Sequence, residues 1–227
     1  MNTADYAIQH AEALADYPMA FDGAANEAVI DAGVGLDDYA VVVWILGEES
    51  TVEQTFSASE RSLVADYLAN GGNLFVSGSE IGWHLDEQDG DPDFYENALH
   101  ANYLADDAGS RTVAGESESM FEGISLSFDD GSEVYNVDWP DRIDAVNGAT
   151  RVMHYTGAGS GGAAVAFAGG SPERRVIMLS FPFETMIEAG DRRAVRAAAM
   201  DYLCEADNSP CAAGNIPDGV IFEDGFE

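Results

Sequence analysis

The stretch Val41-Val42-Val43-Trp44-Ile45-Leu46 decides the fold class of this chain. It is a continuous run of apolar, largely β-branched residues, which is typical of a strand buried on both faces of a parallel sheet. Ser57-Ala58-Ser59-Glu60 follows with the pattern of a helix capping box, and Gly71-Gly72 ends the helical pattern. Asn73 to Ser77 is a second apolar run. Strand, helix and strand in this order predict a right-handed βαβ unit.

Further helices and strands are predicted along the rest of the chain. Asp91-Pro92 is a helix start, because proline suits the first helical position. Apolar runs separated by glycine-rich turns are typical of short antiparallel strands. The sequence predicts a helix from Pro92 to about Leu104, a hairpin of Arg151–Tyr155 and Ala163–Phe167, a buried strand at Arg175–Ser180, and a helix from about Asp191 to Cys204.

Together these patterns predict one α/β domain over residues 1–204. We expect a three-layer, doubly wound, mostly parallel sheet with a small antiparallel excursion. Residues 205–227 are expected to form an acidic, turn-rich C-terminal tail. Cys204 and Cys211 have no further Cys or His cluster beside them, so a short-loop disulfide is favoured over a metal site. A disulfide implies an oxidising compartment, which makes the protein secreted, extracellular or periplasmic.

The charge balance excludes several partners. The 227 residues contain 42 acidic and nine basic side chains, giving a formal charge of −33, and every basic residue is an arginine. Such a surface repels nucleic acids and anionic lipids. The longest apolar run is strand-sized, so no membrane insertion is expected. A solvated, salt-tolerant surface is favoured over binding of cations. Because the first residues lack a signal segment, a secreted protein would be a mature fragment or carry an added Met.

Three glutamates follow three predicted strands: Glu49, Glu80 and Glu184. Since ligands of open α/β sheets bind beyond the carboxyl ends of the strands, these residues are candidates for one polar pocket. Two carboxylates can act as general acid and base, and three can hold calcium. The alternative is that each glutamate caps a helix or accepts loop N–H groups.

The segment Gly78-Ser79-Glu80-Ile81-Gly82 has the pattern of a nucleophile elbow, a tight turn from strand to helix that exposes its central residue. That central residue is Glu80. Serine hydrolysis through Ser79 with His84 as base is a weaker alternative, because Ser77 replaces the first glycine of the serine motif.

An acidic loop contains Asp89, Asp91 and Asp93, whose spacing is like that of alternating calcium ligands. The later glycine and glutamate of an EF-hand are not in place. A solvated loop with Asp91 as a helix N-cap is therefore favoured. Calcium is the one ion these patterns suggest, and no other cofactor is expected.

Four short motifs carry a family resemblance: Asn26–Val29, Trp44–Thr51, Ser77–Trp83 and Phe181–Thr185. Over residues 20–204 they look like a domain of large secreted bacterial proteins labelled xanthan lyase, golvesin-like or N-acetylmuramoyl-L-alanine amidase. More distantly, the domain resembles the class I glutamine-amidotransferase-like group, which is flavodoxin-like. There the elbow residue is a cysteine nucleophile. Because Glu80 stands in its place, the chain is not expected to be a glutamine amidotransferase.

The resemblance implies a non-catalytic accessory or ligand-binding domain of a larger secreted protein, with a sugar, a peptide or a cation in its pocket. The end of the chain, Ile221–Glu227, resembles a C-terminal tail of secreted bacterial proteins. The alternative function is a carboxylate-based hydrolase of a polysaccharide or cell-wall polymer, with Glu80 and either Glu49 or Glu184 as acid and base. The expected binding residues are Asn26, Glu27, Glu48, Glu49, Ser50, Ser79, Glu80, Trp83, Phe183 and Glu184.

Overall fold

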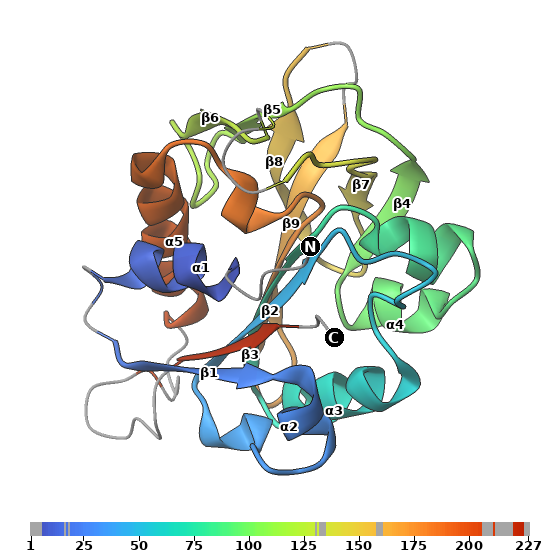
Figure 1. The fold of residues 1–227 in the computed structure, drawn as a ribbon, viewed down its shortest axis with the longest axis vertical. Coiled ribbons are helices and arrows are strands. Elements are labelled where there is room, and N and C mark those ends of the chain that lie inside the picture. Colours follow the sequence, from blue (N-terminus) through green and yellow to red (C-terminus); the bar gives the residue numbers. More distant parts are fainter. Residues whose placement is uncertain are drawn as a thin grey trace.

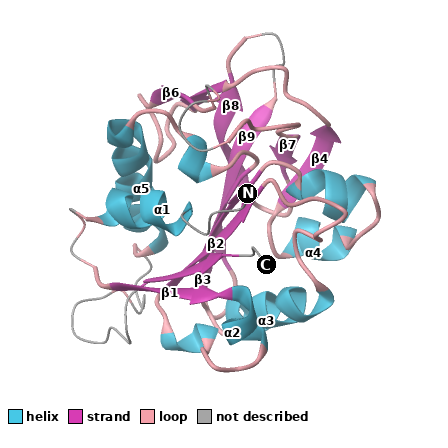
Figure 2. Cartoon of the chain, viewed as in Figure 1, coloured by secondary structure: helices cyan, strands magenta, loops and turns pink. Residues whose placement is uncertain are grey.

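A computed structural model describes residues 6–15, 17, 19–129, 131, 135–157, 161–205, 211 and 220–224, the last group as backbone only. One mixed sheet runs through the molecule, with helices on both of its faces (Figures 1 and 2). None of the described helices is long and apolar enough to cross a membrane.

Helices and strands alternate less regularly along the described residues than the sequence pattern predicted. The helices are α1 (Tyr6–Leu14), α2 (Asn26–Ile30), α3 (Ala58–Ala69), α4 (Pro92–Asn97) and α5 (Ala189–Leu203), with short turns η1 (Leu36–Asp38), η2 (Trp83–Glu87) and η3 (Phe183–Thr185). The strands are β1 (Phe21–Ala25), β2 (Val41–Gly47), β3 (Asn73–Gly78), β4 (Ala101–Ala105), β5 (Thr112–Gly115), β6 (Ser125–Ser127), β7 (Arg142–Ala145), β8 (Thr150–Tyr155), β9 (Gly162–Gly169), β10 (Arg174–Leu179) and β11 (Val220–Asp224).

The strand order and strand directions of the sheet differ from the predicted fold class. Its main path is β1-β11-β2-β3-β10-β9-β8-β5-β6, and β7 branches from β9 to pair with β4. Four pairings are parallel, from β1 to β10, and the other six are antiparallel. The sheet is also strongly curled (Figure 2). The predicted mostly parallel, three-layer flavodoxin-like sandwich is therefore wrong, because the antiparallel part is a major part of the sheet and no small excursion.

The central βαβ unit forms as predicted. β2 and β3 are parallel neighbours, and all seven residues of β2 are buried. Ser57 caps α3: its Oγ accepts the Glu60 N–H, while the Glu60 carboxylate accepts the Ser57 N–H. The two faces of β2 serve two cores. Val43 and Ile45 pack with α1 and α5, whereas Trp44 packs with α3 and α4 on the opposite face.

The helix predicted from Pro92 to about Leu104 is shorter than expected. Asp91 caps it as predicted, with its Oδ1 3.0 Å from the Phe94 nitrogen. The helix ends at Asn97, and His100 has a left-handed φ of 58°, which an α-helix cannot contain. The chain then enters β4, which pairs with β7.

The last described segment, β11, lies inside the sheet. It runs parallel to β1 on one side and to β2 on the other, with Phe21 paired to Val220 and Val220 paired to Val41. No strand is predicted in this region from the sequence, whose pattern indicates a polar, turn-rich tail. Upstream, Cys204 and Cys211 form the predicted disulfide, with their Cα atoms 5.3 Å apart.

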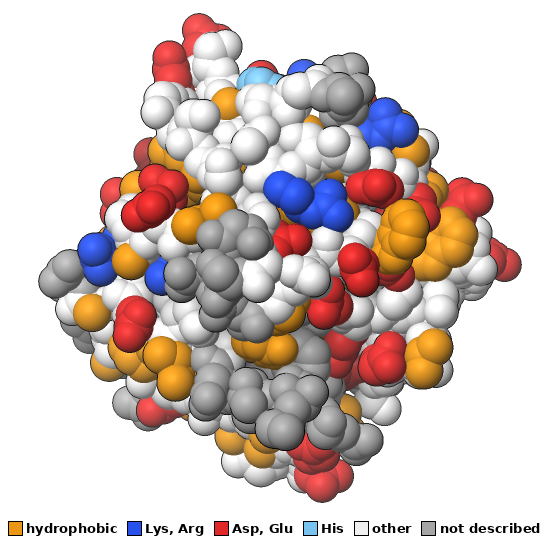
Figure 3. Space-filling model, turned by 45° about the horizontal axis from the view of Figure 1, so that its top comes forward, with side chains coloured by type: hydrophobic (Ala, Val, Ile, Leu, Met, Phe, Trp, Pro, Cys, Tyr) orange, Lys and Arg blue, Asp and Glu red, His pale blue; other side chains and the backbone are white. Residues whose placement is uncertain are grey.

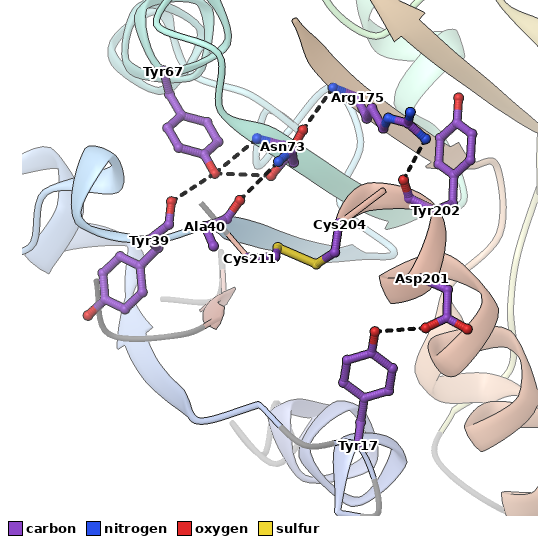
Figure 4. The surroundings of a disulfide bond; sticks show 10 residues. All are labelled: Tyr17, Tyr39, Ala40, Tyr67, Asn73, Arg175, Asp201, Tyr202, Cys204 and Cys211. Atoms are coloured by element: carbon purple, nitrogen blue, oxygen red, sulfur yellow. Dashed lines mark hydrogen bonds between the residues drawn. A yellow bond between two sulfur atoms is a disulfide. The ribbon is translucent and has the colours of Figure 1, made fainter. Parts of the chain in front are cut away.

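The disulfide lies beside the amino edge of β3 and β10 (Figure 4). There Arg175 donates from Nη1 to the Tyr202 carbonyl oxygen at 2.8 Å, which ties β10 to the end of α5. The Tyr67 hydroxyl lies 3.1 Å from the Asn73 carbonyl oxygen and joins α3 to β3. The chain therefore leaves α5 from a well-bonded region before it reaches β11.

Removing residues 220–227 should destabilise β1 more than the rest of the sheet. β11 is the strand that pairs with β1, so its loss deletes hydrogen bonds to both neighbours and should cost about 3 kcal/mol. We expect the melting temperature to fall by roughly 6–12 °C. Hydrogen exchange should accelerate in β1 before β10. A control lacking only residues 225–227 should melt like the full chain; equal protection of β1 in both would contradict the role assigned to β11.

Candidate functional site

The carboxyl ends of the parallel strands meet at one edge of the sheet. β1, β2, β3 and β10 all point toward this edge. The segments that follow them contain Asn26, Glu48 and Glu49, Ser79 and Glu80, and Glu184. The edge thus gathers the predicted residues, but their side chains have very different environments.

Glu184 is fully buried and held by hydrogen bonds. The Tyr135 hydroxyl donates to Oε1 at 2.6 Å, and His10 Nε2 lies 3.3 Å from Oε2. Arg196 Nη2 lies 2.5 Å from His10 Nδ1. Because a guanidinium can only donate, His10 must accept through Nδ1 and donate through Nε2, which is the neutral imidazole. The Arg196 guanidinium also lies 4.2 Å from the ring centroids of both Phe75 and Phe183.

Burial has the largest effect on the pKa values of Glu184 and His10. Burial raises the pKa of Glu184 to about 7, against the opposing effects of the Tyr135 hydrogen bond and of Arg196. Burial, followed by the charges of Arg196 and Arg192, lowers the pKa of His10 well below its usual value. We therefore interpret Glu184, His10 and Arg196 as a buried structural chain. Neither Glu184 nor Phe183 is exposed, so neither lines a surface pocket.

Glu49 and Ser79 are also buried, with 6% and 1% of their surfaces exposed. The Ser79 hydroxyl lies 3.4 Å from the Gly47 carbonyl oxygen and so faces β2. His84 Nδ1 lies 2.7 Å from the Thr55 hydroxyl. These contacts occupy both groups of the proposed Ser79–His84 pair and give serine hydrolysis no geometric support.

Glu80 is the predicted glutamate that keeps a partly exposed side chain on the elbow. It accepts a hydrogen bond from the Ser50 side chain. Burial raises the pKa of Glu80, the Ser50 bond opposes this, and the charges of Asp106, Asp138 and Glu53 raise it further.

Glu48, on the neighbouring strand end, has an exposed side chain whose Oε1 accepts the Asp138 N–H at 3.2 Å. Partial desolvation and nearby carboxylates raise the pKa of Glu48 to about 7, with the Asp138 N–H opposing. We call Glu48, Glu53, Glu80, Asp106 and Asp138 the acidic cluster. In the part of the chain that the structure describes, none of the five forms an ion pair with an arginine or a histidine.

Sequence reasoning missed Asp141, which holds the elbow in place. Its Oδ2 accepts the N–H groups of Gly82 at 2.7 Å and Trp83 at 3.0 Å, and the residue is completely buried. Its Oδ1 has no hydrogen-bond partner among the described residues. Burial raises the pKa of Asp141 well above its usual value, the two N–H groups oppose this, and Glu80 and Asp106 add to it. No local pattern could reveal a contact between residues so far apart in the sequence.

Trp139 was also missed. Its neighbours fix the segment at two strand ends: Asp138 bonds to Glu48, and the Asp141 N–H lies 2.9 Å from the Ser79 carbonyl oxygen. Trp139 itself has a left-handed φ of 53° and is 52% exposed. A tryptophan before a proline in a polar stretch was the signal that could have found it. The predicted Trp83 is partly exposed, with its ring 6.3 Å from that of Tyr103.

The remaining predicted residues lie apart from the acidic cluster or serve other contacts. Asn26 donates to the Glu60 carboxylate of the α3 capping box, and Glu27 is exposed on α2. Asp91 caps α4 and pairs with Arg61 at 2.8 Å. Asp89 and Asp93 flank it in the sequence. Among the described residues, no group of three or more His, Cys, Asp or Glu side chains is arranged to hold a metal ion.

Acidic side chains gather on one face of the molecule, on the side that carries β4 and α4, with hydrophobic side chains among them (Figure 3). A separate groove of about 720 Å³ lies between α3 and α4 and contains none of the acidic cluster. Its walls are mainly apolar, including Ala65, Leu68 and Phe94. The groove is also lined by Asp91 and Asp93 of the candidate calcium loop, whereas the predicted glutamates lie at the carboxyl edge of the sheet.

The comparisons with known proteins identify similar folds but no matching family. No protein-family model and no curated protein matches the sequence. A GH42 β-galactosidase from G. stearothermophilus is similar with a TM-score of 0.56 and 13% identity, over 88% of this chain and 26% of that one. The mmIFT52 N-terminal domain gives 0.52 and 10%, over 80% and 83%. A ThuA-like protein from Bacteroides uniformis gives 0.50 and 13%, over 77% and 73%.

The chain therefore spans about a quarter of the length of the β-galactosidase it resembles. At these identities the likeness shows the fold alone, since one fold serves many functions.

Replacing Arg196 by leucine should strongly destabilise the protein. The change leaves Glu184 buried without its cation, which typically costs about 3–5 kcal/mol. Arg193, exposed on the same helix, provides the matched control, and Arg193→Leu should change stability by less than about 0.5 kcal/mol. Urea denaturation of both variants would measure the difference. Similar midpoints for the two would contradict the buried chain.

Proposed function

We propose that this chain is a non-catalytic, carbohydrate-binding accessory domain of a secreted protein. Its ligand binds over the acidic cluster at the carboxyl edge of the sheet. The observation that carries the proposal is the placement of Glu80, a partly exposed carboxylate on a tight elbow, which accepts a hydrogen bond from Ser50 and whose pKa is raised by burial and by other carboxylates.

The chemistry of this edge suits a sugar. Carboxylates accept hydrogen bonds from hydroxyl groups, and the neighbouring aromatic side chains offer flat apolar surface to the C–H faces of a pyranose ring. Trp83, Tyr103 and Trp139 are all at least partly exposed. A simple cation would use the carboxylates but would leave the aromatic surface without a role.

The burial of two glutamates argues against the hydrolase alternative. A glycosidase needs two carboxyl groups that flank the scissile bond in an open cleft. Glu184 is 0% exposed and Glu49 is 6% exposed, so neither can serve as the second carboxylate beside Glu80. This favours binding over catalysis.

The comparisons and the disulfide are consistent with an accessory role. A region of this fold makes up about a quarter of a GH42 β-galactosidase, a protein that acts on a carbohydrate. The Cys204–Cys211 disulfide agrees with an oxidising compartment.

One observation favours hydrolysis as the second candidate. The pKa of Glu48 is raised to about 7, as a general acid requires, and Asp138 lies beside it. A hydrolase would release reducing ends from an oligosaccharide over time, whereas the proposed binding domain would leave the oligosaccharide intact.

Glu80→Gln should weaken oligosaccharide binding without unfolding the protein. The amide keeps the shape but loses the charge-assisted hydrogen bond, so affinity should fall about tenfold. Calorimetric titration with a panel of neutral, amino and acidic oligosaccharides would measure it. Glu12→Gln, exposed on α1, is the control and should bind like the unaltered chain. A lowered melting temperature with unchanged affinity would overturn the assignment.

The affinity should also depend on pH. Partial burial and neighbouring carboxylates raise the pKa of Glu48 to about 7 and raise the pKa of Glu80 above its usual value, so Glu48 still binds a proton near neutrality. If the ionised forms bind the ligand, affinity for a neutral oligosaccharide, which has no titrating group of its own, should rise as pH increases from about 5 to about 8. Glu48→Gln should flatten this rise, because Glu48 is the group whose pKa of about 7 lies inside this range. A constant affinity across that pH range would show that these carboxylates of the protein do not bind the ligand.

A further inference from the structure

We propose that Trp139 is the stacking platform of this site and that its ligand is a positively charged amino sugar. The inference rests on the proposed carbohydrate-binding function and names the class of sugar. It depends on three observations: how Trp139 is presented, which charges surround it, and one buried oxygen atom.

Trp139 is presented by a segment that is tied down on both sides. Before it, the Asp138 N–H donates to Glu48 Oε1 at the end of β2. After it, the Pro140 carbonyl oxygen accepts the Ala108 N–H at 2.8 Å, and the Asp141 N–H donates to Ser79 at the end of β3. The backbone around Trp139 is thus fixed while its side chain is 52% exposed. Little conformational freedom would be lost when a ligand stacks on it.

The backbone conformation of Trp139 is unfavourable for a large side chain. A φ of 53° lies in the left-handed region that glycine adopts readily and large side chains rarely do. About half of the residue remains exposed in the free protein, at 52%. Its contribution is therefore expected in a complex, where tryptophan is often a residue on which binding depends.

The charges near Trp139 include the cation of Arg111, which donates to the Val137 carbonyl oxygen. Arg111 is already paired with Asp107 and Asp129, so the remaining carboxylates favour a cationic ligand.

Asp138 directly precedes Trp139 in the sequence. The charge of Asp138 raises the pKa of Glu80, and the charge of Glu80 raises the pKa of Asp141. The acidic cluster has no arginine or histidine partner in the described ranges. An anionic sugar would be repelled, while an ammonium group would gain both carboxylates and the face of the indole.

Asp141 supplies an independent observation that points to a ligand. Oδ2 is satisfied by Gly82 and Trp83, but the completely buried Oδ1 has no hydrogen-bond partner among the described residues. Glu80 and Asp106 of the acidic cluster are the carboxylates that act on it. A hydrogen-bond donor is what this oxygen lacks. Because Oδ1 is completely buried, an ammonium or hydroxyl group of an amino sugar would reach it through a bridging water.

An amino sugar fits these features better than a basic peptide. Its ring carries an apolar face, a ring of hydroxyl donors and a cation within one rigid unit, which matches an exposed indole on a segment that is bonded to Glu48 through Asp138. A flexible Lys or Arg side chain offers the cation but must be immobilised on binding. We therefore assign the site to glucosamine-type residues, and a basic peptide becomes an outcome of the test.

The experiment titrates the full chain with oligomers of glucosamine, N-acetylglucosamine and galacturonic acid of equal length, and with an oligolysine peptide. The glucosamine oligomer should bind at least about tenfold more tightly than the neutral one, and its affinity should fall as salt is raised. The galacturonic acid oligomer should bind most weakly.

Two substitutions at Trp139 separate the platform from the fold. Trp139→Gly should weaken binding of the glucosamine oligomer at least about tenfold while raising the melting temperature, because glycine relieves the left-handed φ. Trp139→Tyr should restore most of the binding. Ile8→Ala removes another half-exposed apolar side chain, on α1, and should change neither quantity.

The outcomes distinguish the two proposals. Oligosaccharide binding that Trp139→Gly leaves unchanged, or that prefers the neutral or acidic oligomer, would overturn the inference and leave the proposed function standing. Binding of oligolysine without any oligosaccharide, or no binding at all, would overturn both.

Discussion

The site depends on one buried carboxylate, that of Asp141. It accepts the N–H groups of Gly82 and Trp83 at the start of the turn after β3, and so joins two parts of the chain that the sequence separates widely. Because the residue is completely buried, the bond is shielded from competing water. It fixes both the elbow that carries Glu80 and the segment that presents Trp139. Without it, neither side chain would have a defined position at the carboxyl edge of the sheet.

The predictable part of the fold is the part governed by local signals. The apolar run of β2 and the capping box at Ser57 depend on neighbouring residues alone, and both form as expected. Strand direction is not a local property. β9 and β10 are similar apolar runs, yet they are antiparallel partners joined by a short turn, whereas β10 is parallel to β3. An apolar run shows that a strand is buried, but not which neighbours it has, so the antiparallel share of the sheet was underestimated.

The same limit applies to the glutamates. Their common edge follows from their positions after parallel strands, which a sequence can reveal. Their separate environments follow from distant partners: His10 and Tyr135 enclose Glu184, whereas Glu80 stays partly exposed. Gathering like charges at one edge is costly. The protein lowers that cost by moving Glu184 inward, toward the cation of Arg196, so the glutamates that looked equivalent divide into a structural residue and a surface residue.

The position of β11 also constrains how the molecule can be made. Phe21 pairs with Val220, and the strand between β1 and β2 comes after every other described element. During synthesis, β1 cannot pair with β11 until the end of the chain has been made. In contrast, β2, α3 and β3 can associate early through contacts close in sequence. Until then the flank of β2 is an unpaired edge of apolar residues, open to pairing with other chains. The dense negative charge of the chain, −33 in total, would keep such unfinished molecules apart.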